Sequence, residues 1–595
     1  MTAISTQGAS VAWIALDAAR RFGPRPALTS PRGDPVTYAE LGTAVREIAT
    51  GLAELGIEPG DHVAILASTR PEWTLADFGI LAAGATVVPI YPTNSPEECG
   101  YVLRHSEAVA VVCEDAEQLA KVERVRDGCP ALATVVLVEG EAAGTVSLAE
   151  LRRLGAAGAG DVIERRLARV EPSDVATIVY TSGTTGPPKG CITTHGNLRT
   201  TAAMYERELE LGDGLSMYLY LPLAHSLARV AQAVALQVGG TLAFWGGDAK
   251  KIVEEVAEAR PTHFPSVPRV YEKIHTAVLS GVAEQSRPQR AVFAWALEVG
   301  RRSAARRRKG RPMGRLDRVR HGVADRLVLS KVRGVFGGRL QLALTGAAPI
   351  GREILDFFDA CGVPVLEGYG MSESCAAGTL NTPRATRLGT VGRPLGGTEV
   401  AIAPDGEVLM RGPHVFSGYH RDAGATSETV RDGWLHSGDL GEVDEDGFLT
   451  ITGRKKDLII TSSGKNISPD LIESMLRETR WISQAVVYGD RRSYIVGLLT
   501  LDPDEAPKLA ELAGTSPDPA VMAADPRVRE IVARDVEAVN ERLARVEQVK
   551  RFDILERDLS QADGELTPTL KVKRALVYGA YADRFARLYE GETGP

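Results

Sequence analysis

The sequence predicts an α/β protein: a large N-terminal domain of stacked βα sheets with a small β subdomain, followed by a smaller α+β domain. Three observations predict this fold. Short apolar runs alternate with helical patterns through the first half, short strands separated by turn residues occupy 392–419, and periodic α+β sequence resumes after the charged segment 453–457. Strands that alternate with helices are typical of largely parallel sheets buried on both faces.

The first half supplies its elements in order. Apolar side chains at helical spacing predict a helix over Ala39–Leu55, which Gly56 ends. Val63–Ala67 is a short apolar run that predicts a buried strand, and another helix is expected from about Trp73. Further strands are predicted at Thr86–Ile90, Val109–Cys113 and Thr134–Val138. Because ligands of such sheets bind beyond the carboxyl ends of the strands, motifs are expected in the loops that follow them.

The second half changes character. Short strands at Glu399–Ile402 and Gly406–Arg411, and a turn at Asp444–Gly447 between two more, predict a small β subdomain. The charged, Gly-led segment between two periodic regions suits a hinge. We therefore expect an N-terminal domain over 1–452, a hinge at 453–457 and a C-terminal domain over 458–595.

Composition sets the limits on function. The chain has 595 residues, 44% of them apolar and 25% charged, as in a globular protein that buries several cores. The net charge is −8, and a uniformly acidic surface disfavours nucleic acid and anionic membranes as partners. The charge is not uniform, because Arg301–Arg320 holds ten Arg and Lys residues and one Asp. This basic segment is either a solvated linker or a contact with anionic lipid.

Cysteine usage and hydropathy indicate the compartment. Six cysteines are scattered without a C-x-x-C pair, which predicts reduced, mostly buried thiols and neither a zinc site nor a disulfide framework. The N-terminus has no charged segment of the kind that opens a secretory signal, and the longest apolar stretches, near 78–92 and 231–245, fall short of the ~20 residues that span a bilayer. We expect a cytoplasmic protein that at most lies on a membrane surface.

The strongest local feature is a strand, Val175–Tyr180, that runs into a loop rich in hydroxyl and glycine residues. Backbone N–H groups and hydroxyls after a strand offer donors to an anion, and a lysine adds a cation. It is not a Walker A loop, because Pro188 stands where that motif requires glycine. Composition alone leaves open a phosphate loop or an ordinary surface turn. The candidate residues are Thr181, Ser182, Gly183, Thr184, Thr185, Gly186 and Lys189.

Five further segments follow this loop in a fixed order. They are Gly346–Pro349, Tyr369–Glu373, Trp434–Asp439, Gly453–Asp457 and Thr567–Lys571. With these motifs the chain resembles the adenylate-forming superfamily of acyl-CoA synthetases, luciferases and peptide-synthetase adenylation domains. The segments 221–229 and 267–273 most resemble its long-chain fatty acyl-CoA synthetase branch. The resemblance covers about residues 10–580 and implies ATP, Mg²⁺ and CoA as ligands and a C-terminal domain that moves.

The resemblance also implies a set of nucleotide-binding residues. Tyr369 would lie against adenine, Ser372 would donate to the α-phosphate, and Asp439 would accept the two ribose hydroxyls. An Asp after Ser-Gly is otherwise more often a turn residue. Arg454 would reach ribose or phosphate. Gly346 and Gly370 complete the nucleotide-binding set, and Lys456 occupies the hinge position.

Catalytic roles follow from the same resemblance. Glu373, with Thr181, would hold Mg²⁺, a hard cation that takes oxygen ligands. Lys571 would insert its ammonium between carboxylate and α-phosphate, with Lys573 as the competing assignment. The family usually has glycine before this lysine, whereas Leu570 stands here. His225 is expected between the acyl and pantetheine channels, although a lone histidine is usually structural.

The resemblance implies an AMP-forming ligase that converts a long-chain fatty acid to acyl-AMP and then to acyl-CoA. Two alternatives stay open. One is a fatty acyl-AMP ligase that passes the acyl group to a carrier protein, and the other is a catalytically silent nucleotide- or lipid-binding relative. Fatty acid and CoA are the expected partners, with no nucleic acid, a homodimer as a further expectation, and peripheral contact with anionic membrane through Arg301–Arg320.

Overall fold

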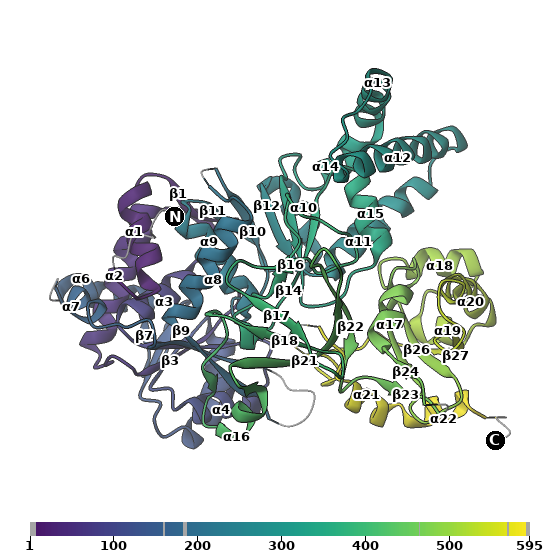
Figure 1. Cartoon of the computed structure of the whole chain (residues 1–595). Coiled ribbons are helices and arrows are strands. Elements are labelled where there is room, and N and C mark those ends of the chain that lie inside the picture. Colours follow the sequence, from purple (N-terminus) through teal and green to yellow (C-terminus); the bar gives the residue numbers. More distant parts are fainter. Residues whose placement is uncertain are drawn as a thin grey trace.

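Two large sheets and the helices between them form most of the molecule (Figure 1). The structure, a computed structural model, describes residues 8–158, 161–181, 187–212, 214–462, 464–567 and 570–590. Each sheet is built mainly from parallel strands with helical crossovers, so its two faces are covered by helices and its central strands are largely buried. The predicted α/β fold, with a larger N-terminal and a smaller C-terminal part, is confirmed.

The first sheet runs in the order β19-β9-β8-β4-β3-β5-β6-β7. Its central strands are parallel, and only β9 and β19 at one edge run antiparallel to their neighbours. The strands are β3 (His62–Leu66), β4 (Thr86–Ile90), β5 (Ala110–Cys113), β6 (Thr134–Leu137), β7 (Val146–Ser147), β8 (Val175–Thr181), β9 (Lys189–Thr194) and β19 (Gly418–Tyr419). The predicted strands of the first half therefore all lie in this sheet.

The second sheet runs in the order β16-β15-β14-β13-β12-β10-β11-β1-β2. Its strands β1, β11, β10, β12, β13 and β14 are parallel, so their carboxyl ends meet at one edge. The strands are β1 (Pro26–Ser30), β2 (Gly33–Thr37), β10 (Ser216–Leu219), β11 (Thr241–Phe244), β12 (His263–Ser266), β13 (Leu342–Thr345), β14 (Val365–Tyr369), β15 (Thr379–Leu380) and β16 (Arg393–Pro394).

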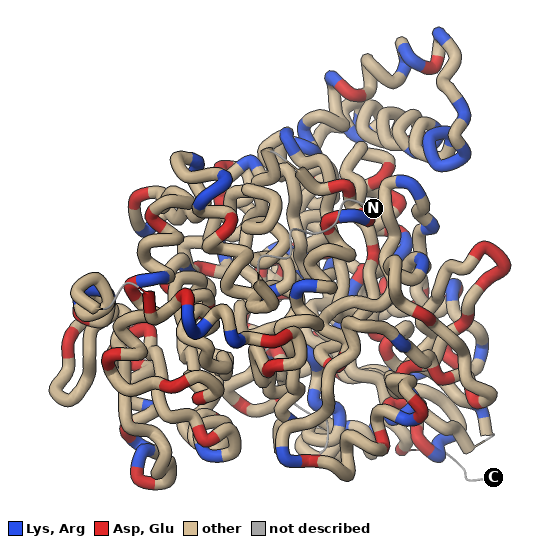
Figure 2. The backbone as a smooth tube through the Cα atoms, turned by 60° about the vertical axis from the view of Figure 1, so that its left-hand side comes forward, with Lys and Arg blue, Asp and Glu red and all other residues tan. Residues whose placement is uncertain are grey.

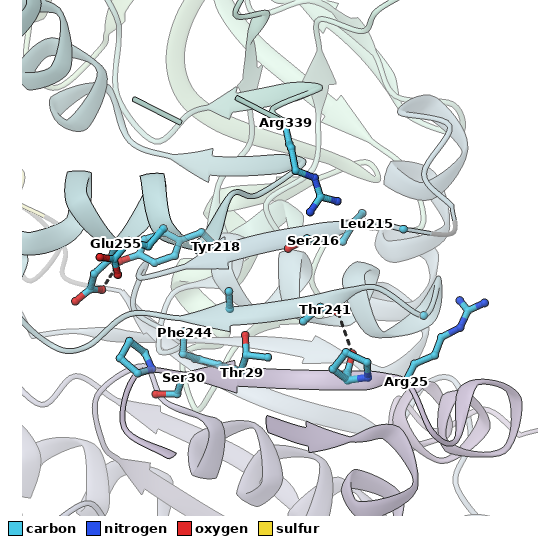
Figure 3. Close-up of a pocket in the computed structure, with 17 residues that line it drawn as sticks. Arg25, Thr29, Ser30, Leu215, Ser216, Tyr218, Thr241, Phe244, Glu255 and Arg339 are labelled. Atoms are coloured by element: carbon cyan, nitrogen blue, oxygen red, sulfur yellow. Dashed lines mark hydrogen bonds between the residues drawn. The ribbon is translucent and has the colours of Figure 1, made fainter. Parts of the chain in front are cut away.

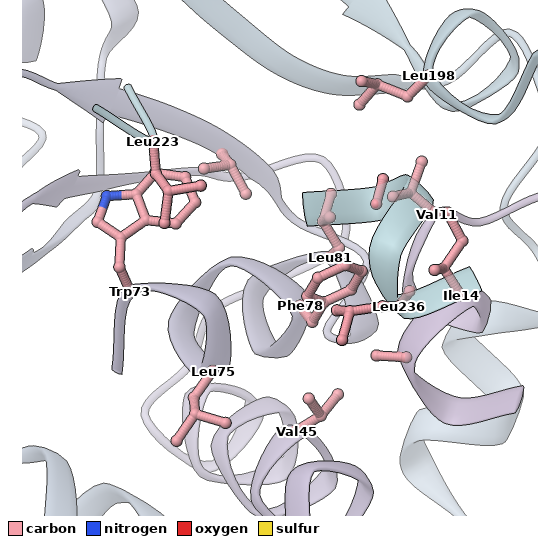
Figure 4. Packing of buried hydrophobic residues seen from close by; sticks show 14 of the residues in the cluster. Val11, Ile14, Val45, Trp73, Leu75, Phe78, Leu81, Leu198, Leu223 and Leu236 are labelled. Atoms are coloured by element: carbon pink, nitrogen blue, oxygen red, sulfur yellow. The ribbon is translucent and has the colours of Figure 1, made fainter. Parts of the chain in front are cut away.

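One layer of helices packs between the two sheets and forms the main core. It consists of α1 (Ala12–Phe22), α2 (Tyr38–Glu54), α3 (Pro71–Ala82), α8 (His195–Glu208) and α9 (Ser226–Gln237). Helix α3 is buried on all sides because it lies in the middle of this layer, with Trp73 and Phe78 almost fully buried (Figure 4). Each such aromatic side chain contributes about 1.5–3 kcal/mol by leaving water. This core fixes the two sheets relative to each other.

Other helices cover the outer faces of both sheets. On the first sheet, α4 (Pro96–Ser106) and α5 (Ala116–Val125) pack through a separate apolar cluster. On the second sheet, α10 (Ile252–Ala259), α11 (Pro268–Ala283) and α15 (Arg352–Ala360) do so through another. The short helices α6 (Leu148–Ala157) and α7 (Val162–Leu167) pack at the periphery against α2. Each sheet thus has helices on both of its faces.

A small antiparallel sheet forms the predicted β subdomain. It orders its strands β17-β18-β21-β20, with β22 paired to β21. The elements are β17 (Glu399–Ile402), β18 (Glu407–Arg411), α16 (Ala423–Thr429), β20 (Val430–Arg431), β21 (Trp434–Val443) and β22 (Leu449–Arg454). Asp444–Gly447 is the turn between β21 and β22, as the sequence predicts. The subdomain brings residues from β21 and β22 beside those that follow β14.

The C-terminal part has its own core. Strands β25, β26 and β27 form a sheet that packs against α17, α18, α19 and α20. Its elements are β23 (Ile459–Ile460), β24 (Asn466–Ile467), α17 (Pro469–Arg477), β25 (Ile482–Tyr488), β26 (Ile495–Leu501), α18 (Ala506–Ala513), α19 (Pro519–Ala524), α20 (Pro526–Asn540), β27 (Val549–Ile554), α21 (Arg574–Ala580) and α22 (Ala582–Leu588).

A helical arm, which the sequence does not predict, projects from the outer side of the second sheet (Figure 1). It consists of α12 (Arg287–Arg308), α13 (Arg315–Ala324), the helical turn η3 (Asp325–Leu329) and α14 (Ser330–Gly334). All six cysteines are buried and unpaired, as predicted. None of the helices in the described ranges combines the length and apolar character that crossing a bilayer requires.

Candidate active site

The predicted site residues gather where the parallel strands end. Gly346 follows β13, Ser372 and Glu373 follow β14, and His225 follows β10 after a short turn. The first sheet contributes Thr181, the last residue of β8, and Lys189, the first residue of β9. Ser182, Gly183, Thr184, Thr185 and Gly186 of the predicted phosphate loop lie outside the described residues. The described ends of that loop therefore face the same region as the motifs of the second sheet.

At two predicted glycines the neighbouring backbone leaves little space for a side chain, least at Gly370. A Cβ on Gly370 would lie 2.6 Å from the carbonyl carbon of Ala376, and one on Gly346 would lie 3.2 Å from the carbonyl oxygen of Gly368. Beside them, Cys375 and Ala376 have φ of 53° and 57°, a left-handed conformation that costs non-glycine residues free energy. The turn after β14 is thus tightly determined around Glu373.

Asp439 joins the β subdomain to the end of β14. The Tyr369 hydroxyl donates to Asp439 Oδ2 at 2.7 Å, and Arg454 Nε lies 3.4 Å from Asp439 Oδ1. Asp439 and Arg454 are direct partners in the β21–β22 ladder, so the strand register holds this ion pair. Burial raises the pKa of Asp439 against the opposing effect of Arg454. Burial lowers the pKa of Arg454, but Asp439 and other carboxylates outweigh it and the pKa lies above its ordinary value.

Glu373 has a partner that the sequence analysis missed. The Tyr419 hydroxyl donates to Glu373 Oε1 at 2.7 Å, while Lys189 Nζ lies 5.1 Å from the centre of the Tyr419 ring. Tyr419 reaches this position because β19 pairs with β9, opposite Cys191. Burial, with Glu373 next in effect, raises the pKa of Tyr419, which therefore stays a hydrogen-bond donor. Nothing in the local sequence around Tyr419 distinguishes it from a structural aromatic residue.

Lys571 lies at the same site although it belongs to the C-terminal part. Lys571 keeps some exposure to solvent. The protein groups around it still remove part of its hydration, and this desolvation, together with the charge of Arg454, lowers its pKa. Asp439, Asp470 and Glu373 act in the opposite direction, so these three carboxylates lie within electrostatic range. An ammonium poised among carboxylates and a guanidinium is positioned to meet an anionic ligand.

The loop that carries Lys571 is closed by its own backbone. The N–H of Thr567 donates to the Lys571 carbonyl at 2.8 Å, and the Lys571 N–H donates to Thr567 Oγ1 at 3.0 Å. Leu570 has φ of 61°, which explains why glycine suits the position before this lysine. Arg574 anchors the following helix to α17 by pairing with Glu473 and Asp470. The competing Lys573 instead precedes α21, and its N–H donates to the Glu565 carbonyl.

His225 combines a structural role with a place near the site. Its Nδ1 accepts a hydrogen bond from the Leu227 N–H at 3.3 Å and so caps the start of α9. Burial first, and then the charge of Lys571, lower the pKa of His225 to about 4. The imidazole is therefore neutral at physiological pH and keeps Nε2–H as a donor. The effect of Lys571 puts the two side chains in one electrostatic neighbourhood.

The remaining predicted residues, Ser372 and Lys456, are described by their exposure and backbone setting. Ser372 begins a short helical turn after β14 and is half-buried. Lys456 is exposed in the turn after β22, where the Asp457 N–H donates to the Arg454 carbonyl at 3.0 Å. Its neighbour Lys455, which was not singled out, pairs with Asp405 and Glu407 at 2.6 Å and 3.0 Å.

A cavity of about 920 Å³ runs along strands β1, β10 and β11 of the second sheet beside α10 (Figure 3). Its lining includes the first residues of these strands, Pro26, Ser216 and Thr241, and the last residues of β1 and β11, Ser30 and Phe244. The Tyr218 hydroxyl donates to Glu255 Oε2 at 2.7 Å in its wall. None of the predicted site residues lines this cavity.

Comparison with known proteins agrees with this arrangement. The family model described as "AMP-binding enzyme" matches residues 16–420, and "AMP-binding enzyme C-terminal domain" matches 456–593. The long-chain-fatty-acid–CoA ligase FadD15 of Mycobacterium tuberculosis is 39% identical over 94% of this chain and 92% of its own length. The long-chain-fatty-acid–CoA ligase ACSBG2 of Xenopus laevis is 34% identical over 97% of this chain and 83% of its own.

Solved structures share the fold at lower identity. The adenylation domain of carboxylic acid reductase from Segniliparus rugosus, in complex with AMP, has a TM-score of 0.77 at 20% identity and covers 98% of this chain and 95% of its own. A fatty acyl CoA synthetase of Mycobacterium tuberculosis has a TM-score of 0.62 at 22% identity, covering 97% and 99%. With its motifs, its fold and these matches taken together, the chain belongs to the AMP-binding enzyme family.

Proposed function

We propose that this protein is an ATP-dependent long-chain fatty acid–CoA ligase. A fatty acid and ATP give acyl-AMP and pyrophosphate, and the CoA thiolate then displaces AMP to give the thioester. The names of relatives such as FadD15 and ACSBG2, aligned over more than nine-tenths of this chain, support the substrate class. No covalent enzyme intermediate is required, because the adenylate itself is the activated acyl donor.

The observation that carries the proposal is the position of Lys571. The first half-reaction brings a carboxylate against the α-phosphate, and the two anions repel. Catalysis therefore requires cations and donors where charge develops. The charges of Arg454, Asp439 and Glu373 all act on the pKa of Lys571, which supports its role at the reacting centre. Asp439, bonded to the hydroxyl of Tyr369, supports a nucleotide whose ribose and adenine lie on adjoining side chains.

The residues near Glu373 fit a magnesium ion. Tyr419 engages Oε1 of Glu373, which leaves Oε2 as an oxygen ligand of the kind Mg²⁺ prefers. Glu373 would hold the ion together with Thr181, which ends β8. When bound, Mg²⁺ neutralises phosphate charge and orients the triphosphate. Lys189 adds a cation at the far side of Tyr419.

The hinge, the acceptor and the partners belong to the same proposal. We infer a boundary at 453–457, with Lys456 at the pivot, that lets the C-terminal domain withdraw Lys571 before CoA attacks.

His225, neutral at physiological pH, would contact the acyl group or pantetheine through Nε2–H. A homodimer and a peripheral contact with membrane through Arg301–Arg320 complete the proposal.

One assay tests the function. The protein is incubated with ATP, Mg²⁺ and palmitate, with and without CoA, and AMP and acyl products are followed. Acyl-CoA supports the proposal. Acyl-AMP that accumulates even with CoA indicates an acyl-AMP ligase, and no product with palmitate or with shorter and longer acids contradicts the ligase assignment.

Lys571→Ala tests the residue that carries the argument. Loss of one well-placed donor to a transition state costs about 10²–10³ in rate. Adenylation, measured by fatty-acid-dependent exchange of pyrophosphate into ATP, should fall by that factor. Lys573→Ala serves as the matched control and should stay within a fewfold of wild type. Adenylation that survives in Lys571→Ala and collapses in Lys573→Ala would reverse the assignment.

A further inference from the structure

The helical arm stands away from the rest of the molecule. It spans residues 287–334, and its helix α13 projects clear of the body (Figure 1). Helix α12 is anchored near its C-terminal end, where Arg307 and Arg308 both pair with the buried Asp359 of α15. The arm is therefore fixed through α12, and α13 follows beyond this anchor.

The arm concentrates positive charge. Residues 287–334 hold 15 Arg and Lys residues against three acidic ones, a net charge of +12 in a chain whose total is −8. The three acidic residues are already paired within the arm, as Glu298–Arg302, Asp317–Arg306 and Asp325–Arg333. Within the described ranges no ion pair involves the exposed Arg311, Arg315, Arg318 and Arg320. These four charges, on α13 and the turn that leads into it, are thus unneutralised, and Figure 2 shows Lys and Arg along the projecting part of the chain.

An apolar stripe runs between these cations. Its members follow one another at intervals of three, four and four residues, which places them on one face of the helix that α13 and η3 continue. They are Leu316, Val319, Val323 and Leu327, exposed by 64%, 64%, 47% and 46%. The other side of α13 faces α12, because Asp317 pairs with Arg306 there and Ala324 is buried. By helical spacing, Arg320 flanks the stripe on one side and Arg315 and Arg326 flank it on the other.

We propose that the arm is a membrane-docking element: the stripe enters the interface of a bilayer while the flanking arginines bind anionic headgroups. Aliphatic side chains bordered by arginines are the pattern of a helix that lies in the plane of a membrane surface. A bilayer with anionic lipid supplies an apolar and an anionic partner in one plane. A second copy of the chain would cover the stripe only by bringing two arms of charge +12 together. The inference sharpens the peripheral contact proposed above, and its binding test needs no ligase activity.

Sedimentation of the full-length protein with vesicles tests the proposal. Vesicles of phosphatidylcholine alone are compared with vesicles that also contain phosphatidylglycerol, without ATP or CoA. Wild type should bind the anionic vesicles and bind the neutral ones at least tenfold more weakly, since each cation near an anionic surface contributes about fivefold in affinity. Equal binding to both, or binding to neither, overturns the proposal.

Two variants separate the stripe from the charge. Leu316→Ser combined with Val319→Ser removes apolar side chains that are mostly exposed to solvent, and should weaken binding by about tenfold without lowering the melting temperature. Leu512→Ser combined with Val521→Ser, exposed by 65% and 46% in the C-terminal part, is the matched control and should bind as wild type. Arg311→Glu combined with Arg315→Glu should abolish the preference for anionic lipid. If the Leu316→Ser and Val319→Ser double variant binds the vesicles as tightly as wild type, the stripe does not insert into the bilayer and the proposal is overturned.

Insertion itself has a direct readout. All six native cysteines are buried, so Val319→Cys introduces an exposed thiol that takes an environment-sensitive fluorophore. Its emission should shift to the blue with anionic vesicles, whereas the same label on Leu512→Cys should not change. A blue shift without lipid, accompanied by a dimer in analytical ultracentrifugation that Leu316→Ser and Val319→Ser together abolish, would make a second copy the occupant and overturn the proposal.

Discussion

Tyr419 shows how a single side chain couples separate motifs. It comes from the strand that pairs with β9, bonds Glu373 after β14 and lies against Lys189. A carboxylate that carries a hydrogen bond has one oxygen fixed, and the other is then aimed at its ligand. This contact depends on pairing between strands more than 200 residues apart in sequence, so no local pattern could have identified it.

We expect Tyr419→Phe to impair magnesium-dependent catalysis. Loss of a hydrogen bond to a charged group costs about 1.5–3 kcal/mol, so adenylation at low Mg²⁺ should fall by roughly tenfold or more. The measurement is the initial rate of adenylation as Mg²⁺ is varied, together with thermal stability. Tyr218→Phe is the matched control, because that hydroxyl also donates to a glutamate at 2.7 Å, Glu255, but in the wall of a cavity that none of the predicted site residues lines. An unchanged magnesium dependence in Tyr419→Phe would show that the contact does not position Glu373.

Glu367 makes the stability of the protein depend on pH. It lies in β14, accepts a hydrogen bond from the Gly389 N–H at 3.0 Å, and burial raises its pKa to about 8 from the 4.5 of an unperturbed glutamate. The folded protein therefore keeps a proton that the unfolded chain releases. Between these two pKa values the free energy of unfolding falls as pH rises, by up to about 1.4 kcal/mol per unit from this group.

Glu367→Gln should remove that slope. The amide is neutral at every pH and still accepts from Gly389, so we expect the variant to gain stability over wild type as pH rises toward 8. Denaturant unfolding of both proteins across this range measures the difference. Glu445→Gln, which changes an exposed carboxylate in the β21–β22 turn, should leave the wild-type slope intact. If the free energy of unfolding changed with pH in the same way in wild type and Glu367→Gln, the proton released on unfolding would belong to another group.

At the scale of elements, sequence patterns predicted the positions of individual strands. The strands β3, β4, β5, β6 and β8 were all predicted within about a residue or two, because each is a short apolar run bounded by turn residues. The arm was not predicted, because the sequence of its helices does not indicate that they project away from the rest of the molecule. The contacts of Lys571 were reached only through resemblance, since the residues between Asp439 and Lys571 carry no spacing that brings the two together.

Helix α11 carries contacts between the two main parts. Arg269, in its first turn, has Nη2 3.1 Å from Asp502 Oδ2 and 3.0 Å from Ser483 Oγ, all partly or wholly buried. These contacts favour the arrangement in which Lys571 lies at the site. A rotation of the C-terminal domain has to break them, so they bias the protein toward adenylation.

Arg269→Ala should therefore act unequally on the two half-reactions. Loss of a partly buried pair costs about 1–3 kcal/mol, so adenylation should slow by about fivefold or more. Acyl-CoA formation from supplied acyl-AMP should be unchanged or faster. Lys273→Ala is the control, because the Lys273–Asp504 pair is exposed and such pairs contribute about 0–1 kcal/mol. Equal slowing of both half-reactions by Arg269→Ala would indicate damage to the fold instead of a shifted equilibrium.

The whole molecule distributes its charge and its motion unevenly. Outside the arm the chain is strongly acidic, while the arm is basic and contains none of the proposed catalytic residues (Figure 2). The proposed nucleotide site, in contrast, combines residues of the N-terminal part with Lys571 of the smaller part, whose pKa responds to the charges of Arg454, Asp439 and Glu373. Membrane contact through the arm and rotation of the C-terminal part can therefore proceed independently.

Locking the two parts together tests whether that rotation is needed. Lys273 Nζ and Asp504 Oδ2 lie 2.9 Å apart across the junction, and both side chains are exposed. With every native cysteine buried, a short bismaleimide should link Lys273→Cys to Asp504→Cys and little else. The linked protein should still form acyl-AMP, because Lys571 stays at the site, but should lose acyl-CoA formation. Each single variant treated with the same reagent should keep both activities. A linked protein that makes acyl-CoA at the wild-type rate would mean that CoA attacks in this arrangement, with Lys571 still in place.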